Sequence, residues 1–228
     1  MSNATKSASL ASEFLSRLKQ QVPPFVETIV TSLAKTYQLD VSRYPADHVC
    51  YRTENMAEYA ELTAALRQQD SQCILLIESE IGNRPIATFW LQEGIRVSSL
   101  DRIIHVLEIP APKRGRAYPR GLEHVEFVIH NNSTTTTRSD QYPSPVNGAH
   151  HQAAFDDLMR QRPNVPWDTR ARNKEINPDI SLKLELQLQN SPTCTKSDAK
   201  QCSVKFHLVP LDKVIEFETM TGKVDHKS

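Results

Sequence analysis

The sequence lacks several features that would assign the protein to a broad functional class. Lys and Arg total 27, Asp and Glu also total 27, and the formal net charge is zero. No basic stripe with interleaved aromatic residues is present, which argues against nucleic-acid binding or an anionic-membrane anchor. The apolar runs, such as Cys73-Ile74-Leu75-Leu76-Ile77, are far shorter than the roughly 20 residues that a membrane span needs. We therefore expect a globular protein that contacts neither nucleic acid nor a membrane.

Two further absences concern the cellular compartment. The N-terminal residues lack the continuous apolar core of a secretory signal, and Glu13 comes too early for a typical transit peptide. The four cysteines show no CxxC spacing, and two of them, Cys50 and Cys73, fall in predicted strands. Buried thiols are favoured there over disulfide partners. These features predict a reduced, cytoplasmic protein.

Residues 1–43 predict a helical segment packed on the domain that follows. Pro23-Pro24 interrupts the pattern, which predicts two helices joined at a turn or one sharply kinked helix. Apolar residues recur there at three- and four-residue spacing: Phe14, Leu15, Leu18, Phe25, Val26, Ile29, Val30, Leu33 and Ala34.

Residues 44–219 predict one domain of two similar modules, at 44–112 and 120–219. The first module has the order β-α-β-β-β, with Gly82-Asn83 as a hairpin turn. Its strands are expected at 47–53, 73–79, 84–91 and 102–109, and its helix at 57–68.

The second module predicts the same order of elements. Its strands are expected at 123–129, weakly at 167–171, and at 180–188 and 203–209, with helices at 152–160 and 211–219. The starting strands match: Asp47-His48-Val49 in the first module and Glu123-His124-Val125 in the second. Two polar stretches, near 131–149 and 190–200, have too little apolar surface to offset ordering entropy and are expected to be surface insertions.

Alternation along the strands places chemically reactive side chains on one face. His48, Cys50 and Arg52 share a face opposite Val49 and Tyr51. His124 and Glu126 likewise share a face, opposite Val125, Phe127 and Ile129. Imidazole, guanidinium and carboxylate groups buried without partners would cost several kcal/mol each, so this face must line solvent, a cavity or a metal site.

The last strand of each module adds one candidate ligand, Glu108 in the first and His207 in the second. Together with His48 and His124 they form a set of three imidazoles and a carboxylate. This set suits Fe, Mn, Ni or Zn as a single divalent ion with open positions for substrate. A lone histidine in a strand is usually structural, but two in equivalent places of a repeat favour metal or substrate contact.

Four sequence blocks resemble the bacterial YecM family over about Phe25 to Glu218, outside the two polar insertions. They are Ala46-Asp47-His48-Val49, Gly82-Asn83-Arg84-Pro85-Ile86, Gly121-Leu122-Glu123-His124-Val125-Glu126 and Val204-Lys205-Phe206-His207. The family belongs to the vicinal oxygen chelate superfamily, with glyoxalase I, extradiol dioxygenases, methylmalonyl-CoA epimerase and bleomycin-resistance proteins.

The resemblance implies an α+β fold in which paired β-α-β-β-β modules form a half-open mixed barrel around a metal. By position, it implies His48, Glu108, His124 and His207 as the metal ligands. A carboxylate is common in the superfamily at the last of these positions, where this chain has a histidine.

The remaining polar residues allow functional and structural interpretations. Glu126 is a candidate general base or a partner that orients an imidazole, or it is simply solvated. Arg52 and Arg84 are candidates to bind an anionic substrate group, although surface ion pairs are the commoner role of arginine. His105 is expected to be structural, and His150-His151 to be solvated.

Three functions are compatible with these residues. The first is a metal-dependent enzyme of the isomerase, lyase or dioxygenase class that acts on a small oxygen-bearing substrate. The second is a non-catalytic module that binds a small molecule in the same cavity. The third is a metal-free scaffold for protein contacts. The oligomeric state does not follow from the sequence.

Overall fold

The computed structural model describes residues 3–68, 71–113, 115, 119–129, 142–186 and 200–222. Seven strands form one mixed sheet with the order β2-β3-β4-β1-β5-β7-β6. The strands are β1 (Ala46–Arg52), β2 (Cys73–Glu80), β3 (Pro85–Val97), β4 (Arg102–Pro110), β5 (Gly121–Val128), β6 (Ile180–Leu186) and β7 (Lys200–His207). The helices are α1 (Asn3–Tyr37), α2 (Met56–Leu66), α3 (Ala149–Gln161) and α4 (Leu211–Thr221), with a short 3-10 turn at Ser98–Leu100.

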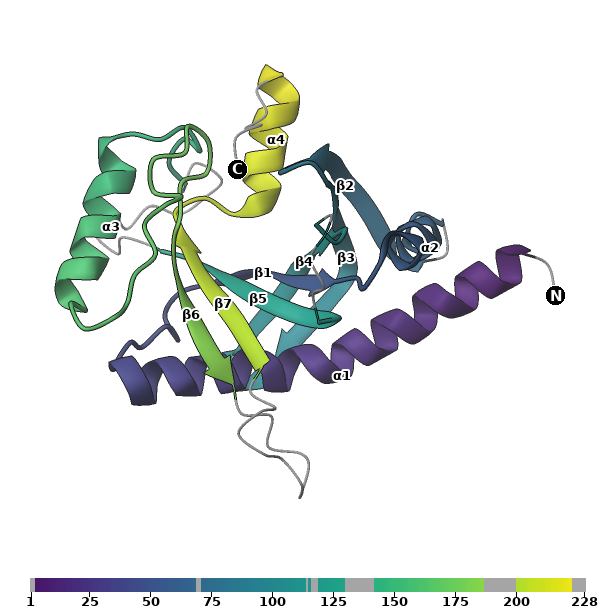
Figure 1. The fold of residues 1–228 in the computed structure, drawn as a ribbon, viewed down its shortest axis with the longest axis horizontal. Coiled ribbons are helices and arrows are strands. Elements are labelled where there is room, and N and C mark those ends of the chain that lie inside the picture. Colours follow the sequence, from purple (N-terminus) through teal and green to yellow (C-terminus); the bar gives the residue numbers. More distant parts are fainter. Residues whose placement is uncertain are drawn as a thin grey trace.

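The sheet is not closed into a barrel, because β2 and β6 stand at its two edges (Figure 1). The two modules have the same strand pairing at the centre of the sheet. Strand β1 pairs in parallel with β4, β5 pairs in parallel with β7, and β1 and β5 are antiparallel to each other. The first and last strands of each module are therefore neighbours at the centre. This is the α+β, half-open architecture that the resemblance to the YecM family implied.

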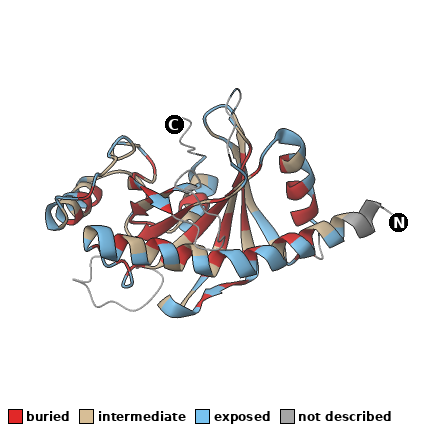
Figure 2. Cartoon of the chain, turned by 60° about the horizontal axis from the view of Figure 1, so that its bottom comes forward, coloured by how far each residue is buried: buried red, intermediate tan, exposed pale blue. Residues whose placement is uncertain are grey.

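Helix α1 covers the apolar face of this sheet. It contacts β3 on one side and β5 and β6 on the other, and the residues along its sheet-facing side are buried (Figure 2). The buried positions keep three- and four-residue spacing through the whole helix: Ala11, Phe14, Leu18, Val22, Val26, Ile29 and Leu33. They share one hydrophobic core with Val49, Val125 and Phe127, so the apolar face predicted for β1 and β5 is confirmed.

The N-terminal segment decides between the two alternatives that the sequence left open. Pro23 and Pro24 lie inside α1, which is one helix and not two. Neither proline belongs to the buried stripe, so packing of Val22 and Val26 on the sheet continues across the missing hydrogen bonds. Tertiary packing therefore overrides the local breaking signal.

The second module also differs from its expected plan. No strand forms at 167–171 in this described part of the chain, where Asp168 makes only an isolated bridge with Ser181. Pro166 offers no backbone N–H directly before this point, and the Asp168 carboxylate accepts hydrogen bonds from Arg170. The module is therefore β-α-β-β. Most of the two predicted insertions, at 130–141 and 187–199, lies outside the described residues.

None of the described helices is both long enough and apolar enough to cross a bilayer.

Candidate metal centre

Strands β4, β1, β5 and β7 carry the candidate site residues except Arg84, which lies in the turn between β2 and β3. Strand register places His48 beside Glu126 and Cys50 beside His124 across the β1–β5 pair. Across β5 and β7, Glu126 lies beside Lys205, and His207 follows two residues further along the same face. The expected matched pair, His48 and His124, therefore comes from two central antiparallel strands.

Three histidines converge on a single carboxylate. The Nε2 atoms of His48 and His124 lie 3.3 and 3.2 Å from Glu126 Oε1, and Nε2 of His207 lies 3.6 Å from Oε2. All four residues are buried, with exposed fractions of 5% or less. The sequence predicted that this polar face would line solvent, a cavity or a metal site. In the structure these four side chains lie directly against one another.

The spacing of these donor atoms suits a bound metal ion. Ligands about 2.1 Å from one ion are separated from each other by about 3.0 Å in octahedral and about 3.4 Å in tetrahedral geometry. The observed separations of the three Nε2 atoms from Glu126 lie close to this range. Ligand atoms of His48, His124 and Glu126 all lie within 4.8 Å of one another, whereas His207 meets that limit with Asp47 and His48. The three Nε2 atoms are buried and have no hydrogen-bond partner within the described chain. Three unpaired buried nitrogen atoms beside one carboxylate are the pattern expected where an ion completes the bonding.

The opposite nitrogen of each ring faces a protein oxygen. His48 Nδ1 lies 2.7 Å from Asp47 Oδ2, and His207 Nδ1 lies 2.6 Å from the carbonyl oxygen of Val209. His124 Nδ1 lies 3.5 Å from Glu123 Oε2. Such partners fix the Nδ1–H tautomer and direct the Nε2 lone pair to a ligand.

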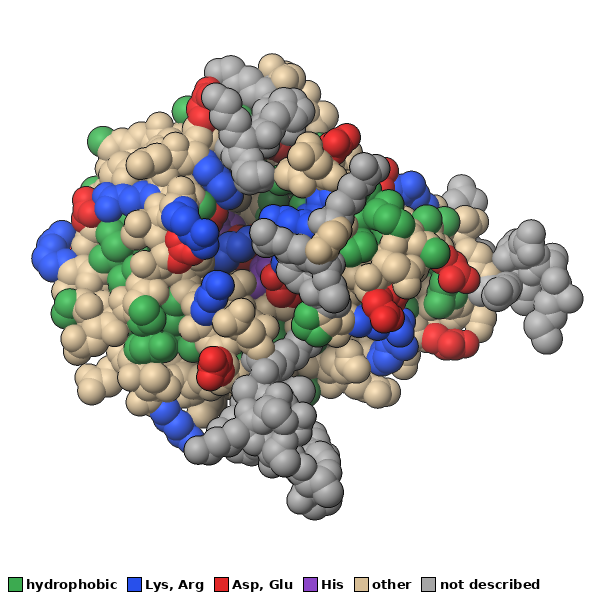
Figure 3. All heavy atoms as spheres, in the orientation of Figure 1, with side chains coloured by type: hydrophobic (Ala, Val, Ile, Leu, Met, Phe, Trp, Pro, Cys, Tyr) green, Lys and Arg blue, Asp and Glu red, His purple; other side chains and the backbone are tan. Residues whose placement is uncertain are grey.

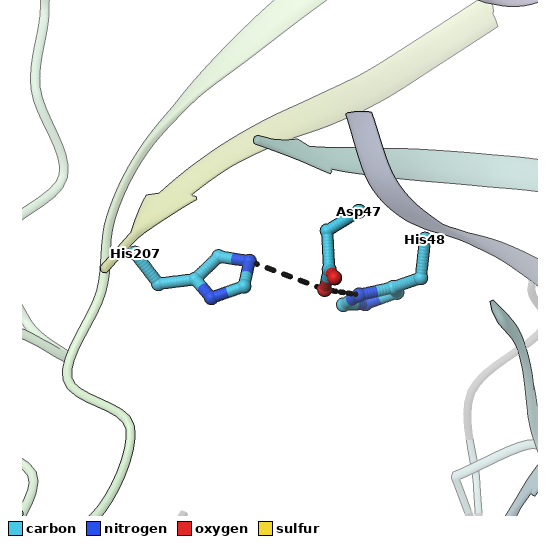
Figure 4. Close-up of side chains that lie close together, drawn as sticks. All are labelled: Asp47, His48 and His207. Carbon is cyan, nitrogen blue, oxygen red and sulfur yellow. Dashed lines mark hydrogen bonds and ion pairs between the residues drawn. The ribbon is translucent and has the colours of Figure 1, made fainter. Parts of the chain in front are cut away.

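Asp47 also ties the site to the C-terminal helix. Its carboxylate accepts the backbone N–H of Leu211, the first residue of α4, and its Oδ2 lies 3.5 Å from His207 Nε2. Figure 4 shows the Asp47 carboxylate between the imidazole rings of His48 and His207. One carboxylate thus connects β1, the end of β7 and the start of α4.

Two β-bulges explain why these acidic residues reach the histidines next to them. Ala46 pairs with Phe127 and His48 with Glu126, so Asp47 is an extra residue in β1. In β5, Glu123 is extra in the same way, because Cys50 pairs with His124 and Tyr51 with Leu122. A bulge changes the direction of a side chain that regular alternation would send to the opposite face.

Sequence reasoning missed Asp47 and Glu123 as orienting partners. The acidic residue that directly precedes each matched histidine was the available signal.

Lys205 is a third residue that sequence reasoning missed, although one of the family blocks contains it. Its ammonium donates to Glu126 Oε1, and its side chain remains partly exposed. Burial opposes ionisation of Glu126, but Lys205 and His48 outweigh it and hold the pKa of that carboxyl well below its usual range. Burial likewise lowers the pKa of His48, but Glu126 and Asp47 outweigh it and raise that pKa to about 10.

Glu108 lies on the other side of His124 from His207. It pairs in register with Cys50, and ligand atoms of Cys50, Glu108 and His124 all lie within 4.8 Å of one another. A corresponding group of His48, His124 and Glu126 meets the same limit. The structure thus brings together His48, His124, His207 and Glu126, and it places Glu108 at an adjacent group that shares His124.

Both candidate arginines lie near this adjacent group. Arg52 forms an ion pair with Glu123, and Arg84 donates from Nη1 to the carbonyl oxygen of Ala111 at 2.8 Å. Burial and the nearby Arg52 lower the pKa of Arg84, which also interacts with Cys50 and Glu108. In the face drawn in Figure 3, histidine atoms are visible at the centre with Lys and Arg atoms around them.

Three further histidines lie in the described residues outside this site. His105 hydrogen-bonds through Nδ1 to the carbonyl of Leu91 and stacks on Trp90, which agrees with a structural role. His150 is exposed as expected. His151 is only 1% exposed, so its expected solvation is wrong, because α3 turns that side chain toward the core together with Phe155.

Comparisons with known proteins agree with this architecture. The family model described as YecM protein matches residues 15–218. A solved structure titled "Structural Genomics, Protein EC4020" is 20% identical with a TM-score of 0.54, and the match covers 96% of this chain and 97% of that one. No curated protein matches the sequence significantly.

Two enzymes of known structure show weaker likeness. A selenomethionine form of methylmalonyl-CoA epimerase is 10% identical with a TM-score of 0.39, covering 71% of this chain and 93% of that chain. A triple mutant of 4-hydroxymandelate synthase from Streptomyces coelicolor is 11% identical with a TM-score of 0.32, covering 77% and 54%.

Proposed function

The chain belongs to the YecM family, and we propose that it binds one divalent transition metal ion through His48, His124, His207 and Glu126. One observation carries the proposal: three buried Nε2 atoms without a hydrogen-bond partner in the described residues surround a single carboxylate at 3.2–3.6 Å. Three imidazoles and one carboxylate suit Fe, Mn, Ni or Zn and leave coordination positions for a substrate.

This ligand set exchanges two roles that the sequence suggested. Glu108 was expected to bind the metal and Glu126 to act as the base. Glu126 lies within 3.6 Å of all three Nε2 atoms, and its low pKa makes it a weak base at neutral pH. Glu108 lies instead beside Cys50, where it is available for another role.

We propose a small oxygen-bearing substrate with an anionic group. A divalent ion would polarise the oxygen atoms of such a substrate and stabilise negative charge that develops on it. Lys205 is partly exposed and lies next to Glu126, while Arg52 and Arg84 lie on the far side of His124. Arginine binds carboxylate and phosphate groups bidentately, so these arginines would select and orient the anion. Isomerase, lyase and dioxygenase chemistry are all compatible with this arrangement.

Elemental analysis of the purified protein tests metal binding. We expect about one transition metal ion per chain in the Glu126-centred site, and His48→Ala, His124→Ala or His207→Ala should remove it. His150→Ala is the matched control, because His150 is exposed and should leave the metal content unchanged. Negligible metal in the wild-type protein, or equal content in all variants, would refute this site.

The alternative is a non-catalytic module that binds a small molecule in the same place. The contacts of Glu126 favour it, because a carboxylate held by Lys205 and three imidazoles is poorly placed to carry a proton. Metal-loaded protein should be assayed with dicarbonyl, catechol and epimerisable acyl substrates. Turnover that disappears in His207→Ala supports an enzyme, whereas binding without turnover supports the module.

A further inference from the structure

A second group of potential ligands lies beside the Glu126-centred site and is not used by it. Register aligns Glu108 on β4, Cys50 on β1 and His124 on β5 in one row across three adjacent strands. Their ligand atoms lie within 4.8 Å of one another. Glu123, the extra residue of the β5 bulge, contributes a second carboxylate to this row.

Glu123 Oε2 lies between two of these donors. It is 3.7 Å from Cys50 Sγ and 3.5 Å from His124 Nδ1. Tetrahedral bonds of about 2.3 Å to sulfur and about 2.1 Å to nitrogen or oxygen separate a sulfur from an oxygen by about 3.6 Å and a nitrogen from an oxygen by about 3.4 Å. The observed distances therefore approach those of ligands that share one metal ion.

The two nitrogens of His124 face different groups. Nε2 lies 3.2 Å from Glu126 Oε1, within the Glu126-centred site, and Nδ1 lies on the side of Glu123. A single imidazole can therefore contribute one nitrogen to each of two ions. Cys50 is fully buried, so its thiol is shielded from bulk oxidants, and sulfur is the donor that selects thiophilic ions.

We propose that Cys50, His124, Glu108 and Glu123 form a second metal position, which takes a thiophilic divalent ion such as zinc and shares His124 with the Glu126-centred site. Binding releases two protons to solvent, one from Cys50 Sγ and one from His124 Nδ1. The ion replaces the hydrogen bonds that these two groups make to Glu123.

The charges around the row are compatible with this exchange. Glu108 and Glu123 are balanced by Arg52 and Arg84, which interact with the same residues. Release of two protons leaves a thiolate and an imidazolate, whose two negative charges match one divalent ion. A thiol and a protonated imidazole nitrogen would otherwise repel that ion.

Cobalt(II) titration of the metal-free, full-length protein tests the second position. We expect two ions per chain by native mass spectrometry, and a near-ultraviolet thiolate-to-cobalt charge-transfer band that belongs to the second position. Cys50→Ala should lose that band and one equivalent of cobalt. Cys202→Ala is the matched control, because Cys202 is also a buried strand cysteine but lies in the hydrophobic core, and it should keep both.

A binding limit of one ion without the band, or a band that persists in Cys50→Ala, overturns the second position. Glu108→Gln retains the thiol and provides an independent test should Cys50→Ala not fold. It should weaken the second equivalent at least tenfold, and unchanged affinity also overturns the proposal. His207→Ala separates the two sites. It should remove the cobalt ion of the Glu126-centred site and leave the thiolate band of the second position. Failure of one site is therefore distinguishable from failure of the other.

Discussion

At the residue scale, the orientation of His48 depends on two carboxylates on opposite sides of its ring. Asp47 accepts a hydrogen bond from Nδ1, which turns Nε2 toward Glu126. Asp47 receives the N–H of Leu211 as well, so its position is fixed from two elements. The position of the His48 ring is thus set by a residue that the predicted strand alternation would place on the other face.

Asp47→Asn tests this positioning role. The amide retains the size of the side chain but loses the negative charge, so we expect metal affinity to fall by about 10- to 100-fold with little change in fold. Competition with a chromophoric chelator measures the affinity. Asp157→Asn on the exposed side of α3 is the control. Equal affinities of Asp47→Asn and wild type would contradict the role.

His151 gives a prediction for stability against pH. Burial first, and then His150 and His207, lower the pKa of its imidazole to about 4. The unfolded chain, with a pKa near 6.5, therefore binds the proton more readily, and stability falls as the pH drops from about 6.5 towards 4. At pH 5 the titration of His151 alone should lower the free energy of unfolding by about 2 kcal/mol relative to neutral pH.

Urea unfolding at pH 7 and pH 5 measures this effect. His151→Phe should lose about 2 kcal/mol less stability than wild type over that interval, because other groups titrate equally in both proteins. An identical loss in both proteins would show that His151 titrates normally.

At the element scale, α1 joins the two modules by lying across both. Its buried stripe runs from Ala11 to Leu33 and passes Pro23 and Pro24 without a break. The sequence predicted helix on both sides of the prolines, but the choice between one helix and two depends on contacts with β3, β5 and β6 that are distant in sequence. Packing of these buried residues on the sheet thus compensates for the helix hydrogen bonds that Pro23 and Pro24 cannot donate.

Pro24→Ala measures how much the proline lowers the stability of the protein, because Pro24 cannot donate a helix hydrogen bond. Pro24 is exposed, so the change should affect the backbone and not the core. A proline in a helix interior costs about 3 kcal/mol relative to alanine, and the greater freedom of the unfolded chain offsets up to about 1 kcal/mol of the gain. We expect the free energy of unfolding to rise by about 2 kcal/mol in urea denaturation.

Gln20→Ala, at another exposed position of α1, should change stability by less than about 0.5 kcal/mol. A Pro24→Ala protein no more stable than wild type would contradict the expectation that Pro24 destabilises the helix.

At the scale of the whole molecule, the candidate metal centre arises from the repeat. The matched strands Asp47-His48-Val49 and Glu123-His124-Val125 were readable in the sequence, and they become the central antiparallel pair β1 and β5. Strand alternation also indicated His207, whereas the half-open sheet was implied by the resemblance to the YecM family. The roles of Glu108 and Glu126 were not readable, because they depend on the register between strands and on two bulges. Sequence patterns locate faces, whereas register decides which side chains meet.

Anomalous diffraction from crystals of the full chain loaded with one divalent metal tests the metal centre most directly. Data collected on both sides of the absorption edge of that metal would locate the ion. We expect a peak about 2.1 Å from the Nε2 atoms of His48 and His124 and from a carboxylate oxygen of Glu126, with the His207 ring turned in as the fourth ligand. A metal-loaded crystal with no peak among these four residues would contradict the account.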